Sequence, residues 1–389
     1  MSTTRPLSAG LLAVAASATL ALSGCQSASE PSAAATNSSD VSAAQQALDA
    51  YVKTGPPVNI DFPPVTQAAS TLRGKRIFYI PILTAPPLFQ SQANLLKKAA
   101  GALGMSVTVC NGNSNPADIT SCFNQATSSG AAGIITDSIP PGLAPQAYQD
   151  VVTKKVPTVA LNINQEVPGQ YTSMVSAFDR QEVKQSAITA DQIIVDSGGD
   201  AEVLLIAIND SEATTNSVAK GIEPEFKQNC PRCKLNKLAI NSSQLGNVPS
   251  LVATGLVQHP NADYVYAQFD VVAQGAIQGV TQQQKAGQVK IVSVNGTLGA
   301  LQSINSGAMF ADTGSDINYE AWASMDMLVR QMLGADPMAE EHGKKIPLRT
   351  YTKQSMTDIQ LNSNDYESGK WFGDPAAYEG AFKKLWGVQ

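Results

Sequence analysis

Histidine is nearly absent from this chain, since His259 and His342 are the only two in 389 residues. Histidine is the commonest general base in hydrolases and a frequent zinc ligand. The chain also lacks the GxSxG, HExxH, GxGxxG and Walker patterns of hydrolases, zinc proteases and nucleotide-binding proteins. These absences argue against an enzyme, against a metal site and against a bound cofactor.

Clusters of positive charge are missing as well. The chain has 26 Lys and Arg against 32 Asp and Glu, which gives a formal net charge of −6, and the basic residues are spread along it. Domains that bind nucleic acid carry a basic patch. Nucleic acid is therefore not expected as a partner.

Apolar runs long enough to cross a membrane are also missing. The run LLAVAASATLAL at residues 11–22 falls short of the about 20 residues that a membrane-spanning helix needs. Its position after Arg5, close to the N-terminus, is typical of a secretory signal peptide. Small residues Ser23 and Gly24 then precede Cys25, and the order LSGC resembles the lipobox of bacterial lipoproteins.

The lipobox resemblance implies cleavage before Cys25 and lipidation of that residue. Two or more acyl chains anchor a protein stably, where one chain is marginal. We therefore predict a signal peptide over residues 1–24 and an extracytoplasmic protein anchored in the membrane through Cys25, on the cell surface or in the periplasm. The following residues, QSASEPSAAATNSSD, hold little apolar bulk to bury, which predicts a flexible tether over residues 25–71. A plain secretory signal with a chance cysteine is the alternative.

Four cysteines remain in the body of the chain: Cys110, Cys122, Cys230 and Cys233. An even number in an exported protein indicates disulfides, and four cysteines allow three pairings. We prefer the two local pairs, Cys110–Cys122 and Cys230–Cys233. The CxxC spacing of the second pair also occurs in redox centres and zinc sites, but no second CxxC is present, and this one lies between a predicted helix and a predicted strand.

Short apolar runs alternate with amphipathic segments along the body of the chain. Strands are predicted over residues 76–83, 105–110, 131–137, 156–162, 201–210, 233–241, 262–270, 288–296, 308–314 and 345–353. Helices are predicted over residues 89–103, 116–126, 145–154, 181–196, 215–228, 247–258, 271–286, 319–334 and 378–389, with Asn115 as a helix cap. Such alternation is typical of parallel sheets flanked by helices.

The pattern pauses at residues 171–179 and then restarts, and the body exceeds one typical core. We therefore predict the α/β class, with two doubly wound parallel-sheet lobes joined by a three-crossing hinge near residues 176–180, 311–315 and 341–350. The N-terminal lobe would contain residues 72–177 and 313–340. The C-terminal lobe would contain residues 178–312 and 341–360, and residues 361–389 would form a tail with a closing helix.

Four stretches carry a family resemblance: KRIFYIPILTAPPLFQ, NPADITSCFNQATSSGAAGIITD, YVYAQFDVVAQGAIQGV and IVSVNGT. In this order and spacing the chain resembles type I solute-binding proteins, the ribose- and galactose-binding class of ABC-transporter receptors, over about residues 72–360. The resemblance implies the type I periplasmic binding protein fold. It also implies a monomer that captures a small polar solute between two lobes and delivers it to an ABC permease, without being an enzyme.

Polar residues follow several predicted strands, and in doubly wound sheets ligands bind at the carboxyl ends of strands. The resemblance implies that Asp137 accepts hydrogen bonds from sugar hydroxyls and that Phe269 and Asp270 form the matching pair of the second lobe. The remaining candidates are Phe89, Asn164, Thr214, Asn216, Asn295 and Asp312. The alternative is that such residues only cap helices or form turns.

The candidate lining departs from that of known sugar binders. Leu88 and Phe89 replace an aromatic pair, and Asn295 stands where these proteins commonly carry Asp. Carboxylates repel anions, while amides both donate and accept hydrogen bonds. The lining therefore favours a neutral polyhydroxylated or mildly cationic solute, a sugar or polyol first and a small aromatic or amine-bearing compound second.

Two other functions stay open on the sequence. One is a sensory receptor of the same fold, which would pass its closed state to a kinase or chemoreceptor. The other is an extracytoplasmic hydrolase, because SVAK at residues 217–220 matches SxxK. The companion motif KTG at residues 53–55 stands in the reverse order, which argues against the hydrolase.

Overall fold

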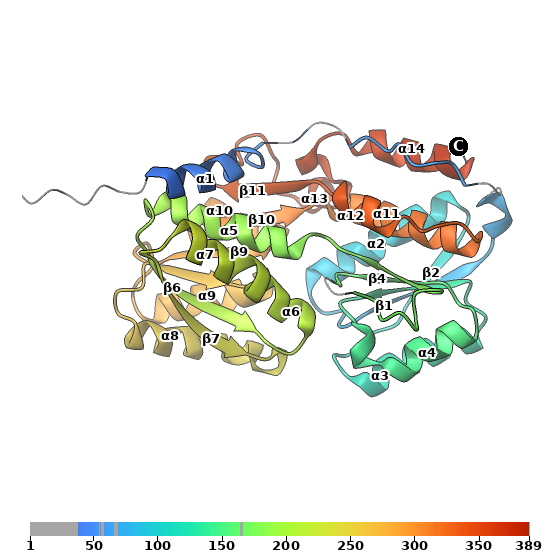
Figure 1. Ribbon diagram of the computed structural model, residues 1–389, viewed down its shortest axis with the longest axis horizontal. Helices are drawn as coiled ribbons and strands as arrows, with labels where there is room; N and C mark the ends of the chain where they lie inside the picture. The colour runs from blue at the N-terminus through green and yellow to red at the C-terminus, as the bar shows by residue number, and fades with distance from the viewer. Residues whose placement is uncertain (1–37, 54, 56–57, 66–68, 164–165, 389) are drawn as a thin grey trace, which may run out of the picture. The chain divides into compact units, whose positions relative to one another are not determined.

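The computed structural model describes residues 38–53, 55, 58–65, 69–163 and 166–388 (Figure 1). The predicted signal peptide, the lipidation site Cys25 and the candidate ligand residue Asn164 lie outside the described residues. Everything below concerns the described part of the chain.

The first sheet is wholly parallel and has the strand order β2-β1-β3-β4-β5. Its strands are β1 (Arg76–Pro81), β2 (Ser106–Val109), β3 (Gly133–Asp137), β4 (Thr158–Leu161) and β5 (Val175–Phe178). Because β1 and β3 run in register from Ile77 opposite Gly133 to Pro81 opposite Asp137, their carboxyl ends meet at one edge. Strand β5 forms where the predicted pattern pauses, because its Val175 and Phe178 are buried against the sheet.

Helices cover both faces of this sheet (Figure 1). One face carries α3 (Pro116–Ser128) and α4 (Pro145–Thr153), and the other carries α2 (Pro87–Ala102) and α11 (Ile317–Met332). The predicted cap of α3 is confirmed, since the Asn115 side chain accepts a hydrogen bond from the Ala117 amide and Pro116 occupies the first helical position.

The second sheet has the order β11-β10-β9-β8-β6-β7, and only the β10–β11 pair is antiparallel. Its strands are β6 (Glu202–Ile208), β7 (Lys234–Ile240), β8 (Tyr264–Ala267), β9 (Lys290–Asn295), β10 (Ala311–Ser315) and β11 (Leu348–Thr352). Alternate residues of β6 face opposite sides, with Val203 and Leu205 in one apolar core and Leu204 and Ile206 in the other.

The helices of the second sheet divide between these two cores. Helices α5 (Glu182–Asp196) and α7 (Glu223–Asn229) cover one face, joined through α6 (Glu212–Asn216) and a π-helical turn (Ser217–Ile222). The other face is covered by α8 (Val248–Gln258), α9 (Asp270–Gln282) and α10 (Leu298–Ser306), after a 3₁₀ turn (Ser242–Asn247). The α/β class with two parallel-sheet lobes, predicted from the alternation of strands and helices, is thereby confirmed.

The chain crosses between the lobes after β5, after β10 and before β11. The second crossing comes later than predicted. Strand β10 continues to Ser315, with Thr313 paired to both Val294 and Thr350. Residues 313–315 therefore belong to the second sheet, because ladder hydrogen bonds on both sides hold them there. Before the third crossing, the short helix α12 (Ala339–Lys344) packs against β5.

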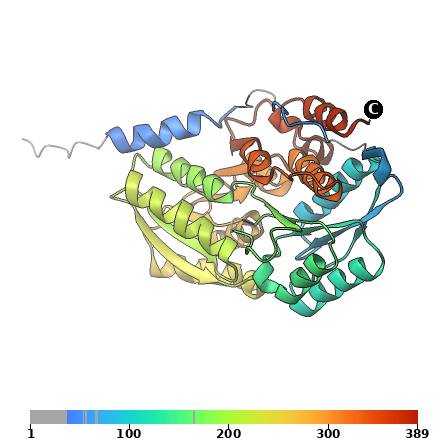
Figure 2. The same cartoon turned by 45° about the vertical axis from the view of Figure 1, so that its right-hand side comes forward.

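The prediction of a flexible tether over residues 25–71 is wrong for its described later part. Residues Ser38–Asp49 form helix α1, which lies along α5 with Ala44 and Leu48 buried (Figure 2). Further on, Phe62 is buried against the ring of His342, at a centroid distance of 4.1 Å. Single small apolar residues spaced four apart predict a helix only weakly. Here the contact with α5 stabilises helix α1.

The C-terminal segment packs on the first lobe. Helix α14 (Pro375–Trp386) lies on α11, where Trp386 stacks on Trp322 with ring centroids 5.4 Å apart. The segment also contains α13 (Ser363–Ser368) and a 3₁₀ turn (Lys370–Phe372), and a further 3₁₀ turn (Ala69–Leu72) precedes β1. A last 3₁₀ turn (Pro141–Leu143) leads into α4.

Both local disulfides are present, Cys110–Cys122 and Cys230–Cys233, so the preferred pairing is confirmed. Cys110 follows β2 and Cys122 lies in α3, so that bridge ties an edge strand to its covering helix. Among the described residues, no helix has the length and apolar character to span a bilayer.

Candidate functional site

Asp137 is the centre of a buried polar group in the first lobe. It ends β3 and is 1% exposed, and its carboxylate accepts hydrogen bonds from the Tyr79 hydroxyl at 2.7 Å and from Asn162 Nδ2 at 2.6 Å. Burial raises the pKa of Asp137, while these two hydrogen bonds and the charge of Arg180 act to lower it. The carboxylate is thus oriented from two neighbouring strand ends.

A second buried group lies in the second lobe, around Asp270 and Asp312. Ser293 Oγ lies 2.5 Å from an oxygen of Asp270 and 2.9 Å from an oxygen of Asp312. The amides of Gly296 and Thr297 donate to Asp312 and Asp270 at 3.0 and 2.8 Å. Burial and the neighbouring Asp270 raise the pKa of Asp312 well above its ordinary value. Since a serine has one hydroxyl proton, Ser293 donates to only one of these two carboxyl groups at a time.

Arg180 is a buried cation at the first crossing. Its Nε and Nη2 donate to Ser315 Oγ at 3.3 and 3.1 Å, and Nε lies 3.6 Å from Glu320 Oε2. Burial raises the pKa of Glu182 to about 7 and that of Glu320 to about 8, while the charge of Arg180 opposes both shifts. Arg180 therefore joins the first crossing to the second and to helix α11.

The two candidate aromatic residues occupy helix starts. Phe89 is half-buried in the first turn of α2, and Phe269 immediately precedes α9, half-buried against both cores of the second sheet. Each lies at the carboxyl end of the strand before it. Their role as stacking faces for a ligand stays a prediction.

The capping alternative accounts for the hydroxyl of Thr214. It forms a capping box with Ser211, whose hydroxyl accepts from the Thr214 amide at 3.1 Å. Asn216, at the end of α6, is buried. Asn295 ends β9 in a left-handed conformation, with φ +126°, and is 8% exposed. A non-glycine residue in this region is strained and is held there by its surroundings.

Two residues of these groups, Tyr79 and Ser293, were not considered from the sequence, whereas Asn162 is one of the polar residues that follow predicted strands and Arg180 is the cation predicted nearest to the cleft. Tyr79, Asn162, Arg180 and Ser293 join strand ends to one another or one crossing to the next. Asn162 and Ser293 lie at or close to the ends of predicted strands, which is a usable signal. Tyr79 had no such signal, because its partner Asp137 is 58 positions away in the sequence.

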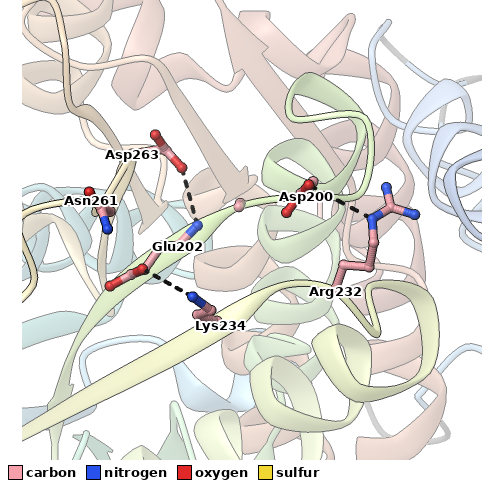
Figure 3. A pocket seen from close by; sticks show the side chains of 7 residues that line it. Asp200, Glu202, Arg232, Lys234, Asn261 and Asp263 are labelled. Atoms are coloured by element: carbon pink, nitrogen blue, oxygen red, sulfur yellow. Dashed lines mark hydrogen bonds and ion pairs between the residues drawn. The ribbon is translucent and has the colours of Figure 1, made fainter. Parts of the chain in front are cut away.

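The surface pocket in Figure 3 is at the other end of the second sheet. It has a volume of about 190 Å³ and is lined by Asp200, Ala201, Glu202, Arg232, Lys234, Asn261 and Asp263. Glu202 and Lys234 begin β6 and β7, so the pocket is at the amino ends of these strands. It shares no residue with the candidate site. The described ranges hold no group of acidic, His or Cys side chains suited to a metal.

A family model described as periplasmic binding protein domain matches residues 77–336. The ribose import binding protein RbsB of Escherichia coli K12 is 24% identical over 227 residues, which are 58% of this chain and 74% of that protein.

Two solved structures illustrate the likeness in fold. The 5-methylthioribose transporter solute binding protein of Thermotoga lettingae TMO, in complex with 5-methylthioribose, has a TM-score of 0.66 at 16% identity, with 83% of this chain and 99% of that chain covered. The glucose-galactose binding protein GanP of Geobacillus stearothermophilus has a TM-score of 0.64 at 14% identity, with 73% and 99% covered.

Proposed function

Because the chain belongs to the periplasmic binding protein domain family, we propose that it binds a small polar solute between its two lobes and delivers it to the permease of an ABC importer. The similar proteins are solute-binding proteins, and this chain is likewise a binding protein rather than an enzyme. The observation that supports a solute site is the pair of buried carboxylate groups, Asp137 in one lobe and Asp270 with Asp312 in the other.

A sugar or polyol is the solute class that this lining suits best. Carboxylates accept hydrogen bonds from hydroxyl groups and repel anions. Asp137 and Asp270 both come at carboxyl ends of parallel strands, the usual location of ligands in such sheets. The names of the similar proteins, which include ribose, glucose, galactose and 5-methylthioribose, point in the same direction.

Binding would couple to the relative position of the lobes. A solute that contacts Asp137 and Asp270 together interacts with both lobes only when they are closed. By mass action it shifts the population towards that closed form, which the permease then recognises. We propose that the protein performs this task as a monomer.

Replacing Asp137 by alanine should weaken binding of the preferred sugar by about 1–3 kcal/mol, since donors on the ligand lose their acceptor in a dry site. Isothermal calorimetry on a panel of sugars, polyols, amines and carboxylates identifies the ligand and measures the loss. Asp200→Ala is the matched control, because the Asp200 side chain is 73% exposed at the opposite end of the second sheet. This variant should bind the ligand with the same affinity as the wild type.

Asp137→Ala also removes the acceptor of the Tyr79 hydroxyl, so the thermal midpoint of each ligand-free variant is measured as well. Asp137→Asn retains the shape of the side chain but not its charge. Comparing its affinity and midpoint with those of Asp137→Ala therefore distinguishes the effect of the lost charge from the effect of unfolding. Tight binding restricted to anionic ligands, or full affinity in a folded Asp137→Ala protein, would contradict the proposed site.

We also propose that the mature protein starts at Cys25 and is held at the membrane by lipid on that residue, after removal of residues 1–24. Replacing Cys25 by alanine should leave the protein unprocessed or release it in soluble form, because the acylated thiol is lost. Fractionation of cells into membrane and soluble extracts measures this, with Ser27→Ala as the control. A Cys25→Ala protein that is cleaved and sediments with membranes as before would show that the anchor lies elsewhere.

A further inference from the structure

Tyr366 in helix α13 carries a buried hydroxyl without a hydrogen-bond partner among the described residues. The residue is 8% exposed, and its ring contacts that of Trp371 at a centroid distance of 5.2 Å. A buried hydroxyl that is left unpaired loses its hydration without compensation, so such groups normally have a partner in the working protein.

The residues that follow Tyr366 tie α13 to the helices of the candidate site. Ser91, which lies with Phe89 in helix α2, donates from its hydroxyl to the Glu367 carboxylate at 2.8 Å. The carbonyl of Ser368 accepts a hydrogen bond from Asn318 Nδ2 at 2.9 Å, and Asn318 lies in α11, the helix of Glu320. Helix α13 is thus attached on two sides to elements that carry site residues.

The end of α13 fits closely against the second crossing. Gly369 has φ +77°, and a Cβ at this position would lie 2.8 Å from an oxygen of Asp316 and 2.7 Å from the Tyr378 hydroxyl. Only glycine allows both the conformation and the contact. This approach places the end of α13 beside Asp316, which follows β10 at the second crossing.

Charged groups from both sheets act on the Tyr366 hydroxyl. Burial raises its pKa, the charge of Arg180 lowers it, and the charges of Asp270, Glu320 and Asp312 raise it further. Two of these acids belong to the second sheet and its helices, while Glu320 is on the helix that covers the first sheet. The charges of the candidate site thus influence the Tyr366 hydroxyl from both lobes.

We propose that Tyr366 presents its hydroxyl to the bound solute, so that the C-terminal segment after β11 completes the ligand site. This inference rests on the proposed function, because it names a further residue of the same site. A phenolic hydroxyl donates one hydrogen bond and accepts others. It is thus suited to a hydroxyl group of a sugar or polyol, and the carboxylates around it accept the remaining ligand hydrogens.

The test compares Tyr366→Phe with Tyr266→Phe. Both changes remove a buried hydroxyl, but that of Tyr266 already donates to the Ser186 carbonyl at 2.8 Å within the second lobe. Thermal midpoints are measured on the ligand-free full chain. Affinities are measured by calorimetry with D-ribose, D-allose, D-galactose and 5-methylthioribose.

We expect Tyr366→Phe to keep or raise the ligand-free midpoint, because no hydrogen bond is lost, and to weaken binding of the tightest sugar by about three- to tenfold. Tyr266→Phe should lower the midpoint and leave affinity unchanged. A fall in the ligand-free midpoint of Tyr366→Phe similar to that of Tyr266→Phe, or an unchanged affinity, would overturn the proposal. If the wild type binds none of these sugars, the proposed solute class fails. The thermal midpoint of the ligand-free Tyr366→Phe protein then decides on Tyr366. A lower midpoint than that of the wild type overturns its assignment, and an equal or higher midpoint supports it.

Discussion

Replacing Arg180 by methionine should lower the free energy of unfolding by about 3–5 kcal/mol, the usual cost of removing one partner from a buried ion pair. Arg180 is 1% exposed and lies 3.6 Å from the equally buried Glu320, with Glu182 and Asp137 also within its electrostatic influence. Without the guanidinium these carboxyl groups lose the cation that compensates their charge. Chemical denaturation of the ligand-free protein at pH 8 measures the loss, because the pKa of Glu320 is raised to about 8 and its carboxylate is substantially ionised only near and above that pH.

The effect of Arg180→Met should depend on pH. The pKa values of Glu182 and Glu320 are raised to about 7 and about 8 from an ordinary 4.5, so the folded protein binds these protons more tightly than the unfolded chain. Their contribution to stability is greatest below pH 4.5 and is lost as pH rises through 7 and 8. Loss of Arg180 raises both pKa values further, so the variant should be more destabilised at pH 8 than at pH 5.5.

Two further variants separate this ion pair from a general loss of charge. Lys220→Met removes an exposed cation and should leave the midpoint nearly unchanged. Adding Glu320→Gln to Arg180→Met removes the uncompensated carboxylate and should restore part of the stability. An Arg180→Met protein as stable as the wild type at pH 8 would show that Glu320 is neutral with or without its partner.

Replacing Asp326 by alanine should cost about 3–5 kcal/mol as well, because it removes the acceptor shared by three buried donors. Its carboxylate accepts from Arg330 Nε at 2.5 Å and Trp386 Nε1 at 2.6 Å, and lies 2.9 Å from His342 Nε2. These donors lie on helices α11, α14 and α12, so one side chain joins three elements. Thermal unfolding at neutral pH measures the change.

The pH dependence of the wild type follows from the same group. Burial acts to raise the pKa of Asp326, but the hydrogen bond and charge of His342, together with Arg330, bring it below its ordinary value of 3.8. The carboxylate therefore stabilises the fold above pH 3.8, and that contribution is lost as pH falls through the lower folded pKa.

Asp326→Asn serves as a milder variant, since its amide oxygen still accepts one of the three hydrogen bonds, and it should lose less stability than Asp326→Ala. Glu340→Ala is the surface control, because the Glu340 side chain is 74% exposed and pairs with the exposed Lys344, and the midpoint of this variant should be nearly that of the wild type. Equal midpoints for Asp326→Ala and Glu340→Ala would mean that helix packing alone holds these three helices together.

The sequence by itself determined the order of most strands and helices, though not β5, α1, α12 or α13, and the division into two lobes. Each of these features depends on neighbours within a few residues: apolar runs for strands such as β3, helical spacing for α2, and the Asn115–Pro116 start of α3. The two disulfides could also be predicted from the sequence, because the paired cysteines are separated by only 12 and 3 positions. The strand-end location of Asp137 and Asp270 followed from the same alternation.

Only the tertiary structure decided which partners the buried polar groups have. Arg180 meets Ser315 across 135 positions, and Ser91 meets Glu367 across 276. Helix α1 has too little apolar surface to be stable alone and depends on α5. Helix α13 lies beside the start of the second crossing because the close approach of Gly369 to Asp316 and the hydrogen bonds of Glu367 and Ser368 hold it there. Local patterns carry no record of such contacts, because their energy comes from groups that only the folded chain brings together and removes from water.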